Sequence, residues 1–98
     1  KKKKKLVVVA RLQEHPKVPQ SEQRLSAGCA AHAILLAAEA LGYAGIWRTG
    51  NAAFDPFVGA ALGLEPGEEV VSFLYLGTRD GNPKTLPTLN TADFVNRW

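Results

Sequence analysis

A short turn, Ile46-Trp47-Arg48-Thr49-Gly50, holds the residues of this sequence that are best suited to ligand binding. It places a large aromatic ring, a guanidinium group, a hydroxyl and a glycine in succession. The indole of Trp47 offers a stacking surface and Arg48 a cation, while Gly50 lets a ligand come close to the main-chain N–H groups. Two interpretations stay open from the residues alone: the turn binds a planar anionic ligand, or it is a structural turn with an exposed arginine.

Side chains that perform acid–base or nucleophilic chemistry are not arranged in a known catalytic pattern. His15 lies in a proline-flanked loop and His32 in the middle of a predicted helix. No serine lies in a nucleophile-elbow motif, and no G-x-G-x-x-G fingerprint follows a strand. Cys29 is the single cysteine, so it forms no internal disulfide and offers no metal-ligand spacing; it is either a small buried hydrophobe or a reactive thiol. We therefore predict no catalytic side chain and no metal site.

The turn follows a long apolar helix, which we expect to begin near Ser21 and to end at Gly42. Between Leu25 and Leu41 its only polar residues are one serine, one histidine and one glutamate. A helix that is apolar nearly all round is expected to be buried on several sides. Its length would be roughly 30 Å. We do not expect this helix to span a membrane, because the apolar stretch between its charged residues is shorter than the ~20 residues required.

The remaining pattern predicts strands and a second, short helix. Branched and aromatic residues predict a strand buried on both faces at 6–10, a short strand or extended turn at 43–47, and a strand at 70–76. Asp55 followed by Pro56 predicts the capped start of a helix that ends at Gly63. A loop at 78–89 and a short terminal helix or arm at 91–98 follow. This order of elements predicts an α+β or mixed α/β fold with the long helix lying on the sheet.

The basic charge of the chain is concentrated at its start. Lys1–Lys5 supply five of the twelve basic residues, and without them seven basic residues face nine acidic ones. We therefore expect no nucleic-acid partner, because a basic stripe along the fold is lacking. Ninety-eight residues form one domain at most. The single cysteine and the absence of a signal-peptide pattern favour a reducing, cytoplasmic location.

Three sequence blocks give the chain a family resemblance. SAGCA begins at Ser26, GIWRTG ends at Gly50, and VVSFLYLGT runs from Val70 to Thr78. Together these blocks resemble the second half of the nitroreductase family, over nearly all of residues 6–98. The resemblance implies the C-terminal half of an α+β fold, with a long central helix packed on a mixed or antiparallel sheet. It also implies an FMN-dependent homodimer. In the family, an arginine-rich segment of the first half holds the flavin phosphate, and that segment has no counterpart in this sequence.

The resemblance assigns the candidate binding residues. Trp47, Arg48 and Thr49 fall on positions that line FMN, and we expect the main-chain N–H groups of Thr49 and Gly50 to face the flavin N5 and O4 edge. Arg48 would bring positive charge to the ring or the ribityl chain, and Trp47 would wall the site. Lys84 is either a phosphate ligand or a solvated loop lysine. A helix-end segment matches a region assigned to NAD(P) contact: Ala37, Ala38, Glu39, Ala40, Leu41 and Gly42.

The activity implied is an NAD(P)H oxidoreductase that reduces a small-molecule acceptor, nitroaromatic or quinone-like, through FMN. The alternative is a non-catalytic structural or dimerisation domain built from the same half fold. We expect a homodimer that packs through small residues of the long helix, including Ala31 and Ala38. In one respect the sequence departs from the family, because Lys2–Lys5 stand where the resemblance places the apolar start of a strand. Either residues 1–5 are a tail before a domain at 6–98, which we favour, or the strand begins late.

Overall fold

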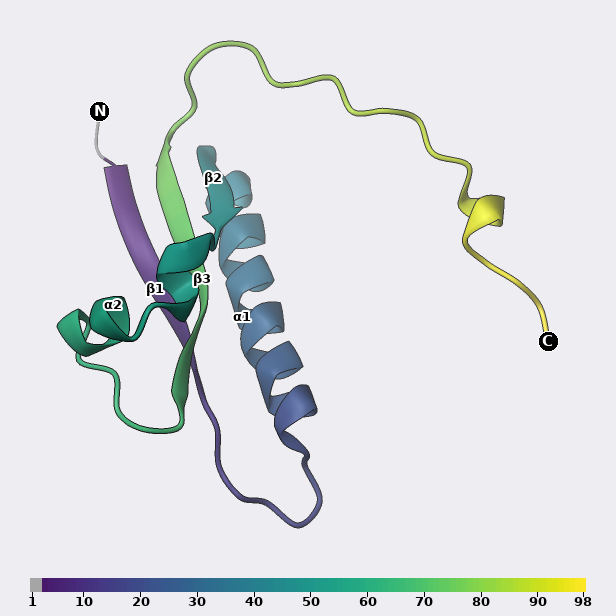
Figure 1. Cartoon of the computed structure of the whole chain (residues 1–98). Helices are drawn as coiled ribbons and strands as arrows, with labels where there is room; N and C mark the ends of the chain where they lie inside the picture. Colours follow the sequence, from purple (N-terminus) through teal and green to yellow (C-terminus); the bar gives the residue numbers. More distant parts are fainter. Residues whose placement is uncertain (1–2) are drawn as a thin grey trace.

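One long helix packs on a small antiparallel sheet in the computed structural model, which describes residues 3–98 (Figure 1). The sheet contains β1 (Lys3–Arg11), β2 (Tyr43–Arg48) and β3 (Glu68–Thr78) in the order β1-β3-β2. Helix α1 (Gln20–Ala40) contacts all three strands. The predicted α+β class and the order of the elements are therefore confirmed, and both strand pairings are antiparallel.

Helix α1 begins and ends at local signals. Its start is at Gln20, after Pro19 in an extended conformation, rather than at the expected Ser21. The carbonyl of Pro19 accepts the N–H groups of Glu22 and Gln23, at 3.0 and 3.2 Å, so it satisfies two first-turn donors in the absence of a side-chain cap. Gly42 has φ +87°, a left-handed conformation that ends the helix as predicted.

Only one side of α1 is buried, which corrects the expectation of burial on several sides. Ala31 is 0% exposed and Ala38 7% exposed, and both lie against the sheet. Leu25 and Leu36 point into solvent. The reason is that the described residues supply one layer for the helix to pack on, so a sequence apolar all round keeps an uncovered face. Ala31 and Ala38 are thus internal contacts of the chain and not available to a partner.

Strand β1 begins within the lysine run, so the expected tail is wrong for Lys3–Lys5. These three lysines pair with Gly77, Leu76 and Tyr75 of β3. Lys1 and Lys2 lie outside the described residues. The backbone of a lysine serves a ladder as well as any other, and its side chain extends into water, so lysines are tolerated on an edge strand such as β1. The expected burial of residues 6–10 on both faces is also wrong, since only Ala10 is buried.

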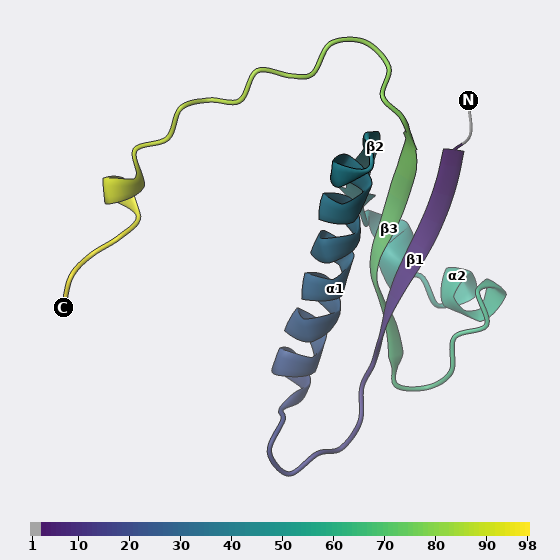
Figure 2. The ribbon, with the colours of Figure 1, turned by 180° about the vertical axis from the view of Figure 1, so that it is seen from behind.

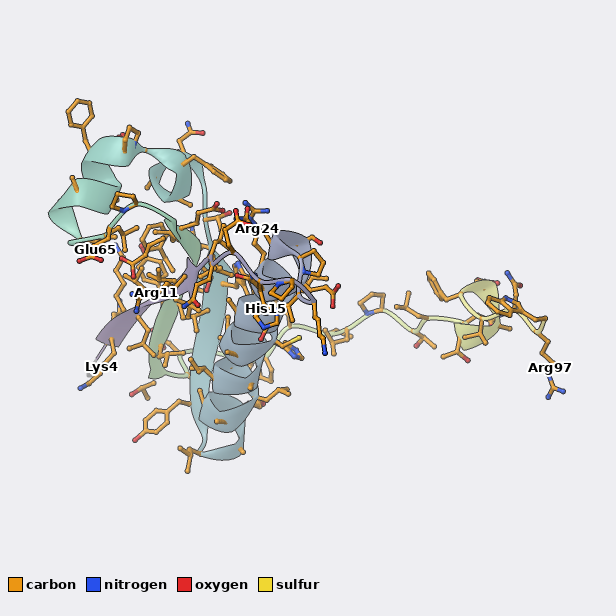
Figure 3. The ribbon with its side chains drawn as sticks, turned by 90° about the horizontal axis from the view of Figure 1, so that it is seen from below. Lys4, Arg11, His15, Arg24, Glu65 and Arg97 are labelled. Carbon is orange, nitrogen blue, oxygen red and sulfur yellow. The ribbon has the colours of Figure 1, made fainter. Side chains whose placement is uncertain are left out.

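The second face of the sheet carries the 3₁₀ turn η1 (Asn51–Phe54) and the short helix α2 (Pro56–Ala61). Seen from behind, α1 lies in front of the sheet and α2 beyond it, and the view from below separates them in the same way (Figures 2 and 3). The Asp55 carboxylate accepts the N–H of Phe57 at 2.8 Å, and Pro56 is the first helical residue, as predicted. We call this second face the outer face.

After β3 the chain leaves the sheet as an extended arm, residues 79–98 (Figure 1). Its one regular element is the 3₁₀ turn η2 (Thr91–Asp93), capped by the Asn90 side chain, which accepts the N–H of Ala92 at 3.1 Å. Figure 3 shows Arg97 far from the labelled residues of the sheet and of α1. The prediction of a terminal arm is confirmed.

Candidate functional site

Alternation along β2 separates the two most distinctive side chains of the turn. Trp47 pairs with Leu74 on the side of α1, and its ring lies 3.8 Å from where a Cβ on Gly28 would stand. Arg48 pairs with Phe73 and points to the outer face, since successive strand residues face opposite ways. The structure therefore places Trp47 against α1, 38% exposed, and does not bring it beside Arg48.

The outer face forms a groove at the end of β2, which we call the Arg48 groove. Its volume is about 720 Å³. It brings together three of the four predicted flavin-binding residues, Arg48, Thr49 and Gly50. Two aromatic residues of β3, two residues of β1 and three apolar residues in and around η1 and α2 complete it; these are Phe73, Tyr75, Lys5, Val7, Ala52, Val58 and Leu62. The groove thus combines an aromatic and apolar floor with cations and a hydroxyl.

The turn at its mouth leaves room for a ligand beside the main chain. Gly50 has φ +63°, in the left-handed region that favours glycine, and a Cβ there would meet nothing within 4 Å. Its carbonyl accepts the N–H of Ala53 at 3.3 Å, which starts η1. Among the described residues, the N–H groups of Thr49 and Gly50 donate to no turn or loop carbonyl. Two donors are therefore open at the position predicted for the flavin edge.

Lys5 is the site residue that sequence reasoning missed. Its ammonium lies 5.1 Å from the ring centroid of Phe73 and 5.3 Å from that of Tyr75. Both distances fall within the range of cation–π attraction. The alternation of Phe73 and Tyr75 along β3 is visible in the sequence and predicts a shared face. That Lys5 covers this face depends on its pairing with Tyr75, which joins residues seventy positions apart in the chain.

The groove has a positive electrostatic character. No carboxylate lines it among the described residues, and none lines the adjoining groove of about 760 Å³ that Lys3, Lys5 and Arg48 share. Two acidic residues are engaged elsewhere: Glu69 binds Arg24 at 2.9 Å and Glu39 binds Arg79 at 2.6 Å. Cations without acidic neighbours on an aromatic floor favour a planar anionic ligand.

One of these distant ion pairs perturbs the titration of its members. The side-chain hydrogen bond from Arg24, more than its charge, holds the pKa of Glu69 below the ordinary value. The hydrogen bond with Glu69, followed by its charge, raises the pKa of Arg24. The pair ties the first turns of α1 to the start of β3, so its role is structural.

The predicted NAD(P) segment lies on the other side of the sheet. Three of its residues, Ala37, Ala38 and Leu41, line an apolar cavity of about 390 Å³ beneath the end of α1. The Glu39 carboxylate is bound to Arg79. Six residues of β2, about 20 Å of strand, separate this helix end from Thr49. Within this chain the two predicted binding segments are therefore not brought together.

The other candidate side chains are placed outside the Arg48 groove. Lys84 belongs to the arm that runs away from the sheet (Figure 1). His15 organises its own loop, since its Nδ1 accepts the N–H groups of Lys17 and Val18, each at 3.1 Å. His32 and Cys29 are exposed on α1, so the interpretation of Cys29 as a buried hydrophobe is wrong. Residues 3–98 contain no cluster of three metal-ligating side chains, and none of their helices is long and apolar enough to cross a membrane.

Comparison with known proteins shows that the chain is similar to nitroreductases. A family model described as "Nitroreductase family" matches residues 3–78. The chain is 48% identical over 73 residues to the Escherichia coli K12 protein "Putative NAD(P)H nitroreductase YdjA", a match that covers 74% of this chain and 40% of that protein. It is 34% identical over 80 residues to a "Putative NAD(P)H nitroreductase" of Haemophilus influenzae, covering 81% of this chain and 44% of that one.

Solved structures agree on the fold. A nitroreductase-like family protein from Bacillus cereus matches with a TM-score of 0.79 at 22% identity, over 94% of this chain and 49% of that one. Nitroreductase A from Vibrio parahaemolyticus matches with a TM-score of 0.67 at 29% identity, over 76% of this chain and 32% of its own. The predicted nitroreductase-like fold is thereby confirmed, and the chain spans less than half the length of the curated relatives it matches. Since the family model and these identities extend over most of its residues, the chain belongs to the nitroreductase family.

Proposed function

We propose that this chain is the flavin-binding C-terminal part of an FMN-dependent oxidoreductase that uses NAD(P)H to reduce nitroaromatic or quinone-like acceptors. The observation that carries the proposal is the Arg48 groove, where Arg48, Thr49 and Gly50 surround one cavity of about 720 Å³. The names of the Escherichia coli and Haemophilus influenzae relatives support the use of NAD(P)H and the class of acceptor.

The residues present fit a flavin mononucleotide. A guanidinium and an ammonium match a phosphate, and the open N–H groups of Thr49 and Gly50 match the acceptor atoms of a flavin edge. Phe73 and Tyr75 form the aromatic floor of the groove, and the Lys5 ammonium lies over both rings. The main chain at Gly50 is open to a ligand, because an added Cβ there would meet nothing within 4 Å.

Each part of the groove has a distinct role in this proposal. When bound, FMN supplies the redox chemistry, taking a hydride from NAD(P)H and passing electrons to the acceptor. The main chain at Thr49 and Gly50 orients the ring by hydrogen bonds. Arg48 supplies positive charge for the anionic part of the bound cofactor. Trp47 acts indirectly, because its packing against α1 holds the end of β2 in place.

The proposed assembly is a homodimer that packs through the uncovered face of α1. Small and apolar residues are exposed along this face, among them Ala30, Ala33, Leu36, Ala37 and Leu41. A helix face of this kind is expected to be covered in a stable protein. The proposed NAD(P) contacts at residues 37–42 lie at one end of the same helix. A non-catalytic dimerisation domain has the same exposed face, so flavin binding decides between the two functions.

The deciding experiment is a flavin fluorescence titration with two proteins. The 98-residue chain alone is expected to bind FMN weakly, because a phosphate needs several charged donors and the groove offers two. A fusion to the preceding portion of the Escherichia coli relative is expected to bind at least a hundredfold more tightly and to oxidise NAD(P)H with a nitroaromatic acceptor. A fusion that folds but stays colourless with excess FMN would support the dimerisation domain instead.

A further inference from the structure

We propose that Lys5 and Arg48 together bind the phosphate group of an aromatic phosphate ester on the outer face of the sheet. The inference deepens the proposed function and rests on it for the identity of the ester, which is FMN. It assigns a phosphate-binding role to a lysine of β1. That lysine belongs to the part of the chain whose sequence departs from the family pattern.

The register of the sheet brings the two cations to one site. Lys5 pairs with Tyr75, and Arg48 pairs with Phe73, so both residues flank β3 with an offset of two positions. Neighbouring strands lie about 4.8 Å apart, which both side chains are long enough to cross. The side chain of Lys5 extends from β1 over β3, since its ammonium lies over the rings of Phe73 and Tyr75. Both residues consequently line the Arg48 groove and the adjoining groove.

The donors of this pair are not used within the chain. Among the described residues, neither Lys5 nor Arg48 has a carboxylate partner. Contact with aromatic rings leaves the ammonium its charge and its N–H donors, because a ring face attracts a cation without accepting its protons as a carboxylate does. A phosphate monoester carries a charge of about −1.5 to −2 near neutral pH. Two unpaired cations at the rim of one groove therefore match that charge.

The groove also discriminates among anions. Inorganic anions would meet the two cations only, whereas an aromatic ester would add contacts with the apolar side chains of Val58 and Leu62. Its aromatic portion would reach the part of the groove that Thr49 and Gly50 line. The expected order of affinity is FMN above phenyl phosphate, with riboflavin weakened by the loss of the phosphate.

The test compares three ligands and four lysine variants of the 98-residue chain. FMN and riboflavin are titrated by flavin fluorescence, and phenyl phosphate by calorimetry. Lys5→Gln removes the proposed ligand, and Lys5→Arg keeps the charge. Lys17→Gln removes an exposed loop lysine as a matched control, and Lys84→Gln tests the arm lysine as the rival phosphate ligand. Circular dichroism at the start of each titration checks that the variants are folded.

We expect Lys5→Gln to weaken FMN binding about tenfold to a hundredfold, because it removes one hydrogen bond between charged groups. The affinity for riboflavin should not change. Lys5→Arg should retain most of the affinity, and Lys17→Gln and Lys84→Gln all of it. Equal FMN affinity in wild type and Lys5→Gln would overturn the role of Lys5 and leave the proposed function standing.

Phenyl phosphate separates the two proposals. If the wild type binds neither flavin but binds phenyl phosphate in a manner that Lys5→Gln abolishes, the phosphate site stands and the flavin function fails. If wild type binds none of the three ligands, both fail. The wild type also provides a test that needs no variant, because equal affinities for FMN and riboflavin would refute a phosphate site even if Lys5→Gln did not fold.

Discussion

The contact between α1 and the sheet can be tested by overpacking it with a single residue. Gly28, Ala31, Leu35 and Ala38 follow one another at helical spacing on the side of α1 that faces the sheet. Ala31 is fully buried. Leucine at that position adds three carbon atoms where no space is left, and such overpacking typically costs about 1–3 kcal/mol. For a domain of this size each kcal/mol lowers Tm by about 4–8 °C, so Ala31→Leu should lower it by roughly 5–20 °C.

The matched control is Ala61→Leu, which makes the same substitution at an exposed position, the last residue of the short helix α2. Leucine and alanine have similar helix propensities, and exposed substitutions usually change stability by less than about 0.5 kcal/mol. Thermal unfolding followed by circular dichroism, at equal protein concentrations, measures the difference. If Ala61→Leu were the more destabilising of the two, the packing of Ala31 against the sheet would be refuted.

Three further results are expected. Leu74→Ala removes a fully buried side chain from the central strand and should cost about 2–5 kcal/mol in chemical denaturation. Leu86→Ala should cost little, because that side chain is exposed on the arm. Deletion of Lys1–Lys5 should lower Tm measurably and speed amide exchange along the end of β3, since Lys3–Lys5 pair with that strand; an unchanged Tm would return these lysines to the status of a tail. Because Arg24 holds the folded-state pKa of Glu69 below its unfolded value, the pair's contribution is present at neutral pH and lost as pH falls through that lowered pKa. The Tm difference between wild type and Glu69→Gln should therefore shrink on acidification. This difference should be small even at neutral pH, because the side chains of Arg24 and Glu69 are both half exposed.

The sequence by itself determined the elements whose signals are local. The left-handed Gly42 after α1 and the Asp55-Pro56 start of α2 follow from the conformational preferences of single residues, which act over a few positions of the chain. The central strand β3 was visible for the same reason. The turn at Arg48, Thr49 and Gly50 was also visible, because a glycine after an apolar strand marks both a bend and an accessible backbone.

Only the tertiary structure decided which side chains share a surface. Trp47 and Arg48 are adjacent in the sequence, yet the pleat of β2 sends them to opposite faces, and the position of α1 makes one of them packing and the other a groove residue. Lys5 joins Arg48 because β3 lies between their strands, a relation set by the register of two pairings and not by any nearby residue. The lysine run was misassigned for the same physical reason: its side chains favour water, but the backbone hydrogen bonds of β3 are what place Lys3–Lys5 in the sheet.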